Sequence, residues 1–300
     1  PASAQVVAVG SGPAGLLAAW RLCQAGLKPV LLERGPDFPR RHQAVATLQG
    51  QGHLDPEANF HFGLGGAGTY SDGKLFTRLG QARVRQILEL LQEHGAGSHD
   101  EICVDAHAHV GTDRWPGVLE SLRSQLETSG CSFRFGHRVE GLLIQSGRLV
   151  GLQLEDGKLS CQACILAPGN SARDLFESLH ASGLRLEAKG LAFGFRMTHP
   201  QELIDEMQYG RAAGHPALGP ASYRLSTRLG SRGVYSFCMC PGGTVIPTPT
   251  EEQALSINGM SNSARDSGEA NAAMVISVAA ERFGGNPIAA MARQRAIERK

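Results

Sequence analysis

The chain has 300 residues, of which 42% are hydrophobic and 19% charged, and its net charge is +1. This composition excludes a disordered chain, and the near-neutral charge does not favour nucleic acid as a partner. Apolar runs stay below the roughly 18–20 residues of a membrane span. The seven scattered cysteines are unlike a secreted disulfide framework. We therefore expect a cytoplasmic protein with no membrane or nucleic-acid partner, whose oligomeric state the sequence does not indicate.

The first 33 residues show the pattern strand, helix, strand. Residues 5–9 are apolar and end at Gly10, which predicts a buried strand. Residues 13–25 have proline at the start and glycine just beyond the end, as helices do. Residues 27–32 are a second apolar strand, closed by Glu33. Such a βαβ unit predicts a parallel sheet.

A glycine turn with the spacing G-x-G-x-x-G, residues 10–15, connects the first strand to the helix. Gly10 permits the tight turn, Gly12 lets a pyrophosphate approach the backbone, and Gly15 lets the helix pack on the strand. The helix N-terminus then holds the phosphates. Glu33 follows Gly10 by 23 positions, where a carboxylate accepts hydrogen bonds from ribose hydroxyls. The pattern predicts a dinucleotide site, and FAD and NAD domains share it.

Further elements follow in chain order. Residues 34–80 are rich in Pro, Gly and Asp and are predicted to be irregular, apart from short helical pieces. Helices are predicted at 81–94 and from the Thr112–Asp113 cap to about 129. Strands are predicted at 131–135, 142–145, 149–155 and 159–166. Turn dipeptides separate the last three, which predicts an antiparallel meander. Beyond about residue 173 no second βαβ pattern occurs.

A second glycine-rich segment, residues 63–74, does not follow an apolar strand, so we do not expect a second nucleotide fold there. Its N–H groups could form an anion-binding nest. A flexible surface loop is the alternative.

The sequence resembles the FAD-dependent dehydrogenase-like proteins of the two-dinucleotide-binding, glutathione-reductase-type flavoprotein superfamily. The meander and the Ala167-Pro168-Gly169 turn are similar to the insertion and return turn of FAD domains. The segments that carry the resemblance are 10–15 with 33–35, 65–74, 110–113, 167–171, 236–243 and 258–261.

The resemblance implies an α/β fold in two parts. Residues 1–173 would be a Rossmann-like FAD/NAD(P)-binding domain with an inserted β-meander, in which residues 34–80 cover the cofactor. Residues 174–300 would be an α+β substrate or cap domain. Superfamily members close the flavin site with a C-terminal glycine/acid segment, which is not visible before Lys300. We therefore expect a piece of a longer protein that lacks this return to the FAD domain.

The resemblance also implies function: oxidoreduction of an unidentified small molecule through FAD, with NAD(P)H as an open candidate for the reductant. The alternative is a flavin-binding or vestigial Rossmann scaffold without turnover. The implied FAD-binding residues are Gly10, Gly12, Pro13, Ala14, Gly15, Glu33, Arg34, Gly65, Gly66, Ala67, Gly68, Thr69, Ser71, Asp72, Lys74, Val139, Pro168 and Gly169.

Two cysteines, Cys238 and Cys240, are the candidate catalytic residues. In an extended segment both sulfur atoms face the same side, next to a glycine turn. They could form a redox pair, or one thiolate could attack a substrate. The alternative is that both are small buried hydrophobic side chains. Cys161 and Cys164 fit C-x-x-C but lie in a predicted strand, which favours core packing.

No metal site is expected. His107 and His109 alternate with alanine but lack zinc-finger spacing. His61, just before the glycine-rich segment, could reach a flavin, but a lone histidine is weak evidence.

Overall fold

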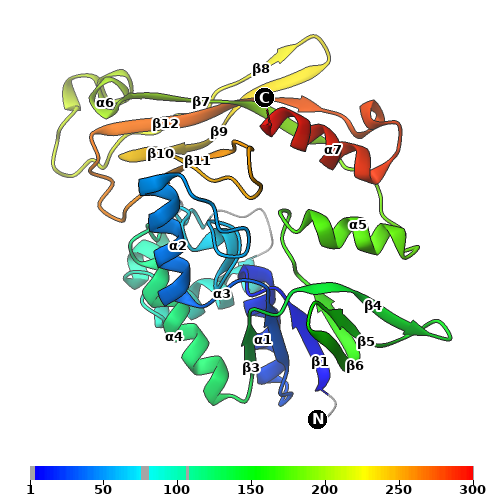
Figure 1. Cartoon of the computed structure of the whole chain (residues 1–300). Coiled ribbons are helices and arrows are strands. Elements are labelled where there is room, and N and C mark those ends of the chain that lie inside the picture. The colour runs from blue at the N-terminus through cyan, green and yellow to red at the C-terminus, as the bar shows by residue number, and fades with distance from the viewer. Residues whose placement is uncertain (1–3, 76–80, 106–107, 300) are drawn as a thin grey trace. The chain divides into compact units, whose positions relative to one another are not determined.

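The computed structural model describes residues 4–75, 81–105 and 108–299 (Figure 1). The chain divides into two compact units, each assembled from separate stretches. The first unit comprises Pro1–Thr69, Pro116–Leu186 and Pro249–Ala254. The second comprises Tyr70–Trp115, Glu187–Thr248 and Leu255–Lys300. The chain thus passes between the two units several times, and residues 70–115 group with the second unit.

The first unit contains a six-stranded sheet with the order β3-β2-β1-β6-β5-β4. The strands are β1 (Ala4–Val9), β2 (Val30–Glu33), β3 (Ser132–Phe135), β4 (Val139–Gln145), β5 (Arg148–Leu154) and β6 (Gly157–Leu166). Strand β1 is parallel to both β2 and β6, and β2 is parallel to β3. Strand β5 is antiparallel to both of its neighbours, β4 and β6. The predicted Rossmann-like sheet and inserted meander are both confirmed.

The core of the first unit lies between this sheet and its helices. Val7, Leu32 and Leu152 are completely buried, and Leu175 and Leu179 of α5 (Arg173–Ala181) pack into the same cluster. Helices α1 (Pro13–Gln24) and α4 (Trp115–Thr128) each bury an apolar stripe at helical spacing. All four residues of β2 are buried. A parallel strand covered on both faces has such a continuous apolar run, because side chains on either face then point into the core.

Helix α2 (Phe38–Gln51) corrects the prediction of an irregular segment at 34–80. It starts at Asp37, has Pro39 in its first turn, and ends at Gly52 with a left-handed φ of 73°. Its buried residues, Phe38, Arg41, Val45 and Leu48, have helical spacing. One member of this stripe is an arginine, so the apolar periodicity that predicts a helix is interrupted in the sequence.

The second unit contains antiparallel strands. Strands β7 (Leu191–Pro200), β12 (Glu269–Val278), β9 (Arg232–Cys240) and β8 (Ser226–Leu229) form one sheet in that order, and β10 (Gly243–Pro247) pairs with β11 (Ile257–Ser261). Its helices are α3 (Gln81–Glu93), α6 (Gln201–Tyr209) and α7 (Pro287–Glu298), and its short helical turns are η2 (Asp100–Val104), η3 (Gly210–Ala212) and η4 (Ala280–Phe283). Ile204, Met239 and Ala270 belong to its core. This agrees with the expected α+β class of the second part.

None of the helices in the described part of the chain combines the length and the apolar character that a membrane span needs.

Candidate functional site

The glycine turn between β1 and α1 contains two kinds of glycine. Gly10 has a φ of 97°, and a Cβ there would lie 2.2 Å from the Ala167 carbonyl oxygen. A Cβ on Gly15 would lie 1.8 Å from the Gly10 carbonyl oxygen. Gly12 differs, because it has a φ of −69° and a Cβ there would meet no atom within 4 Å. Gly10 and Gly15 are thus needed for backbone packing, whereas Gly12 leaves open space beside the backbone.

The N-terminus of α1 faces this open space without a side-chain cap. Gly12 is the N-cap residue and makes no capping side-chain bond, and the first helical bond runs from the Leu16 N–H to the Gly12 carbonyl over 3.0 Å. The N–H groups of a first helical turn have no partner within the helix, and the helix dipole adds positive potential there. This is the arrangement that binds phosphate.

Glu33 joins the glycine turn to the glycine-rich loop. Its buried carboxylate accepts hydrogen bonds from the Ser11 N–H at 2.8 Å and the Ser11 hydroxyl at 2.7 Å. It also accepts from the N–H groups of Gly35 at 2.9 Å and Gly63 at 3.0 Å. A carboxylate has about four acceptor positions. The four hydrogen bonds from Ser11, Gly35 and Gly63 therefore occupy these positions in the structure.

The loop at residues 63–69 lies directly against the glycine turn. The Gly65 N–H donates to the Ser11 carbonyl at 2.9 Å. A Cβ on Gly66 would lie 3.0 Å from Gly12 Cα, and one on Gly68 would lie 3.2 Å from Pro13 Cγ. Glycines here allow the loop to pack closely on the glycine turn.

Arg41, which sequence reasoning missed, supports this loop from within the protein. It is completely buried and donates to the carbonyls of Asn59 at 3.0 Å, Gly66 at 2.7 Å and Leu64, and to the Thr69 hydroxyl at 2.9 Å. In a trans peptide the N–H points away from the preceding C=O. The Ala67 N–H therefore points away from Arg41. The sequence offered one signal for this role: Arg41 has helical spacing with the apolar residues Phe38, Val45 and Leu48, so a charged side chain is expected on a buried face.

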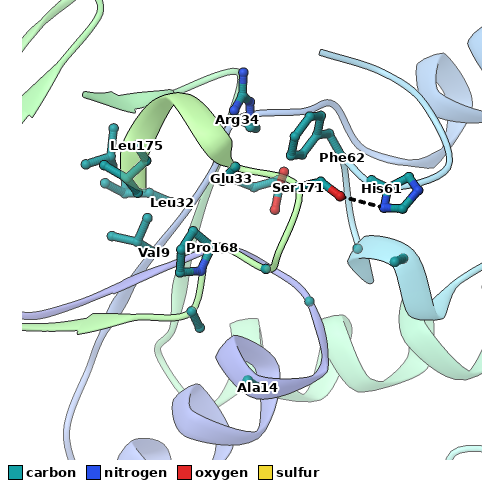
Figure 2. A pocket seen from close by; sticks show the side chains of 18 of the residues that line it. Val9, Ala14, Leu32, Glu33, Arg34, His61, Phe62, Pro168, Ser171 and Leu175 are labelled. Carbon is teal, nitrogen blue, oxygen red and sulfur yellow. Dashed lines mark hydrogen bonds between the residues drawn. The ribbon is translucent and has the colours of Figure 1, made fainter. Parts of the chain in front are cut away.

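The glycine turn, the loop and the end of β6 line a cavity of about 350 Å³ (Figure 2). This volume lies within the usual range for ligand pockets. One wall is apolar and is formed by Val9, Leu32, Val139, Pro168, Ala172 and Leu175. On the polar side the Ser171 hydroxyl and His61 Nδ1 are 2.8 Å apart. The cavity therefore combines an apolar surface suited to an aromatic ring with a phosphate-binding turn.

Two arginines at the cavity, Arg34 and Arg138, are already paired with carboxylates. Arg34 lies 2.7 Å from Glu57 and 2.9 Å from Asp174, and its guanidinium stacks 4.1 Å from the centre of the Phe62 ring. Burial alone would lower the pKa of Arg34, but these two carboxylates raise it overall. Arg138 lies 3.1 Å from Glu57. Both arginine charges are thus compensated by neighbouring carboxylates.

The structure brings most of the predicted cofactor-binding residues to this cavity. Those lining it are Gly10, Gly12, Pro13, Ala14, Glu33, Arg34, Gly66, Ala67, Gly68, Val139, Pro168 and Gly169. Gly15, Gly65 and Thr69 pack behind it. Ser71, Asp72 and Lys74 belong to the second unit.

Several lining residues were not predicted, among them Phe62, His137, Arg138, Asn170, Ser171 and Leu175. Adjacency was the available signal for two of them, because Arg138 directly precedes the predicted Val139 and Asn170 directly follows the predicted Gly169.

The cysteines fall into two chemically different pairs. Cys161 and Cys164 lie in β6, and burial raises the pKa of both thiols, that of Cys164 to about 12. Such thiols are unreactive, as core packing requires. Cys238 and Cys240 lie at the end of β9, within reach of Lys74 of the same unit.

Of the two histidines considered for a metal site, His109 belongs to the second unit. His107 lies outside the described residues. His109 is partly buried, with Nε2 3.3 Å from the Ser261 hydroxyl. Burial, reinforced by Arg265 and Lys74, lowers the pKa of His109 to about 4, although Asp72 and Asp113 act in the opposite direction.

Comparisons with known proteins agree with this geometry. Residues 9–54 match the family model of an NAD(P)-binding Rossmann-like domain, and residues 190–300 match that of an FAD-dependent protein, C-terminal domain-like. Residues 9–54 are thus similar to Rossmann-like nucleotide-binding domains, and residues 190–300 are similar to the C-terminal domain of FAD-dependent proteins. The resemblance noted in the sequence is confirmed at this level.

Individual relatives are similar over different shares of their length. An uncharacterized protein of Clostridium beijerinckii is 42% identical over 299 residues, which cover 98% of this chain and 56% of the relative. The chain therefore spans little more than half of that relative. Among solved structures, L-amino acid deaminase from Proteus vulgaris is 14% identical, with 66% of this chain and 60% of that chain covered and a TM-score of 0.41. Glycine oxidase from Bacillus cereus is 11% identical, with 91% and 71% covered and a TM-score of 0.43.

Proposed function

We propose that the cavity of the first unit binds FAD and that the protein is an FAD-dependent oxidoreductase acting on a small molecule. One observation carries the binding proposal: Gly12 opens onto a cavity at an uncapped helix N-terminus, beside the buried carboxylate of Glu33. The match of residues 190–300 to FAD-dependent proteins favours FAD as the nucleotide.

The residues present fit the nucleotide half of FAD. The N–H groups of the α1 first turn and of Ala67 would hold the diphosphate, since these positions line the cavity. Glu33 would accept hydrogen bonds from ribose hydroxyls. Val139, Leu32 and Leu175 would cover the adenine and exclude water from it.

Bound FAD supplies two-electron chemistry, while the protein positions the cofactor and the substrate. In the first unit this positioning falls to the loop at residues 63–69, whose Leu64 and Gly66 carbonyls accept hydrogen bonds from the buried Arg41. Little of the binding free energy is then spent on ordering the loop.

NAD in the same cavity is the second candidate, because residues 9–54 match an NAD(P)-binding domain. Glu33 disfavours NADP, since a 2′-phosphate would meet its carboxylate. NAD(P)H as the electron donor to FAD is a separate proposal.

Titration of the purified protein with FAD, NAD+ and NADP+, followed by flavin and intrinsic fluorescence, distinguishes these candidates. We expect one FAD per chain, with NAD+ displacing it poorly. Stoichiometric NAD+ binding without FAD binding would overturn the assignment. Anaerobic bleaching of the bound flavin by NADH would support the donor proposal. A protein that binds FAD but is reduced by neither NAD(P)H nor a panel of small-molecule donors would favour the scaffold without turnover.

A further inference from the structure

The second unit holds a cluster of four reactive side chains, Asp72, Lys74, Cys238 and Cys240. A short backbone pairing positions the first two: the Leu75 N–H donates to the Ala108 carbonyl at 2.9 Å. Lys74 Nζ lies 3.4 Å from Cys240 Sγ and 3.9 Å from Cys238 Sγ, and it contacts the buried carboxylate of Asp72. The two sulfur atoms and an Asp72 oxygen lie within 4.8 Å of one another.

The two cysteines differ in exposure and in hydrogen bonding. Cys238 is partly exposed, whereas Cys240 is completely buried. The Cys240 thiol donates to the Cys238 carbonyl over 3.4 Å, which favours its protonated form. The neighbouring Cys240 side chain lowers the pKa of Cys238 against the effect of burial, and the charges of Lys74 and Arg196 lower it further, opposed by Asp72. These effects favour the thiolate form at the partly exposed Cys238 and the thiol form at the buried Cys240.

The backbone at Cys238 is strained. Its φ of 46° lies in the left-handed region, which residues with a Cβ rarely adopt. The pairing of β9 with β12 shifts register between Asn271 and Ala273 at the same place. Arg196 stabilises this conformation, since its Nη1 donates to the Cys238 carbonyl at 3.0 Å and to Asn271 Oδ1 at 2.6 Å. Strain of this kind is typical of functional positions.

We propose that Cys238 and Cys240 form a thiol–disulfide exchange pair that reduces a disulfide-bearing substrate. The proposal goes beyond flavin binding, and a single turnover requires no flavin.

The exchange proceeds in two steps that balance in atoms and electrons. The Cys238 thiolate attacks one sulfur of the substrate disulfide, forms a mixed disulfide, and releases the other half as a thiolate. The Cys240 sulfur then attacks Cys238 Sγ, forms the Cys238–Cys240 disulfide, and releases the second half, which leaves with the Cys240 proton. The substrate gains two electrons and the pair loses two. Lys74 stabilises the attacking thiolate and the departing thiolates by its charge.

A soft metal ion is the competing occupant, because Asp72, Cys238 and Cys240 could supply ligands. The Lys74 ammonium argues against it. It contacts all three groups and thereby supplies the positive charge that a metal ion would bring.

The test uses the reduced, purified protein and dithionitrobenzoate, itself a disulfide, in a stopped-flow experiment. We expect a fast phase that releases two thionitrobenzoates per chain. Peptide mapping should then show a Cys238–Cys240 disulfide. Cys240→Ser should release only one in that phase and retain a mixed disulfide on Cys238. Cys238→Ser should lose the fast phase, and Cys164→Ser, the matched control, should behave like the wild type.

Two results would overturn the proposal. One is a wild-type protein that releases a single thionitrobenzoate per chain and keeps a stable mixed disulfide, because no resolving thiol would then act. The other is purified protein that contains one equivalent of zinc, if this zinc protects both thiols from dithionitrobenzoate and is absent from the Cys238→Ser variant. The wild-type readouts apply even if a cysteine variant fails to fold. Titration of the same samples with FAD measures flavin binding independently. A failure of the thiol–disulfide proposal can therefore be distinguished from a failure of the FAD proposal.

Discussion

Replacement of Gly12 by valine tests the phosphate site most directly. A side chain at this position has room in the protein, because a Cβ would meet no atom within 4 Å and the φ of −69° suits any residue. We therefore expect the variant to fold, with a stability loss of about 1 kcal/mol or less from the poorer N-cap. The added carbons would project into the cavity where the diphosphate is expected.

The magnitude follows from the hydrogen bonds that valine would displace. A hydrogen bond to a charged group contributes roughly 1.5–3 kcal/mol. The loss of two N–H contacts to the diphosphate would cost about 3–6 kcal/mol, which is about a hundred- to ten-thousand-fold in affinity. Gly12→Ala, with one carbon, should show a smaller loss in the same direction.

The assay is a fluorescence titration with FAD, paired with circular dichroism and urea unfolding of each variant. Gly50→Val is the matched control, because Gly50 is an exposed residue of α2 where a Cβ also meets no atom within 4 Å. It should bind FAD like the wild type. A folded Gly12→Val protein whose FAD affinity stays within about threefold of the wild type would refute our placement of the diphosphate, since such a loss is far below the predicted range.

Four further predictions concern stability and reactivity. Gly15→Ala should destabilise the fold by roughly 3 kcal/mol or more, because its Cβ would lie 1.8 Å from a backbone oxygen; a wild-type urea midpoint would contradict this. Arg41→Met should leave buried carbonyls without a donor and cost roughly 3 kcal/mol in urea unfolding, with weaker FAD binding; a stable variant with normal affinity would show that the loop holds itself. The folded-state pKa of His109, about 4, lies below that of the unfolded chain, so the unfolded state takes up the proton first and stability should fall between about pH 6.5 and pH 4. We expect a loss of roughly 1–2 kcal/mol after solvent screening, which should be absent in His109→Asn when unfolding free energies are compared at pH 7 and pH 5. Alkylation of Cys238 by iodoacetamide should have its pH midpoint near 6, below the usual value of about 8.5, and Lys74→Met should move it upward; an unchanged midpoint in that variant would exclude a role for the ammonium.

The parts of the fold that were predictable depend on local chemistry. The turn at residues 10–15 combines a short apolar strand, glycines at fixed spacing and a helix start, and each of these signals acts within a few residues. The meander was predictable for the same reason, since two-residue turns determine which strands pair. The role of Glu33 in the site could be predicted because this residue ends the second strand, 23 positions after Gly10.

The parts that were missed depend on tertiary contacts. Helix α2 escaped prediction because the charged Arg41 occupies a buried position, and only the carbonyls of the glycine-rich loop make that position favourable. The pairing of His61 with Ser171 joins residues 110 positions apart. Lys74 and Cys240 are 166 positions apart, and no local pattern relates them.

The position of β1 in the middle of its sheet has a consequence for how the chain is made. Strand β2 emerges from the ribosome soon after β1, but β6, the other neighbour of β1, ends only at Leu166. At about 5–20 residues per second this delay is roughly 8–30 s. Until then one edge of β1 stays unpaired and Gly10 lacks the Ala167 backbone against which it packs. A growing chain that has not reached residue 167 therefore cannot complete the packing of the turn at residues 10–15, and its open strand edge is a template for aggregation.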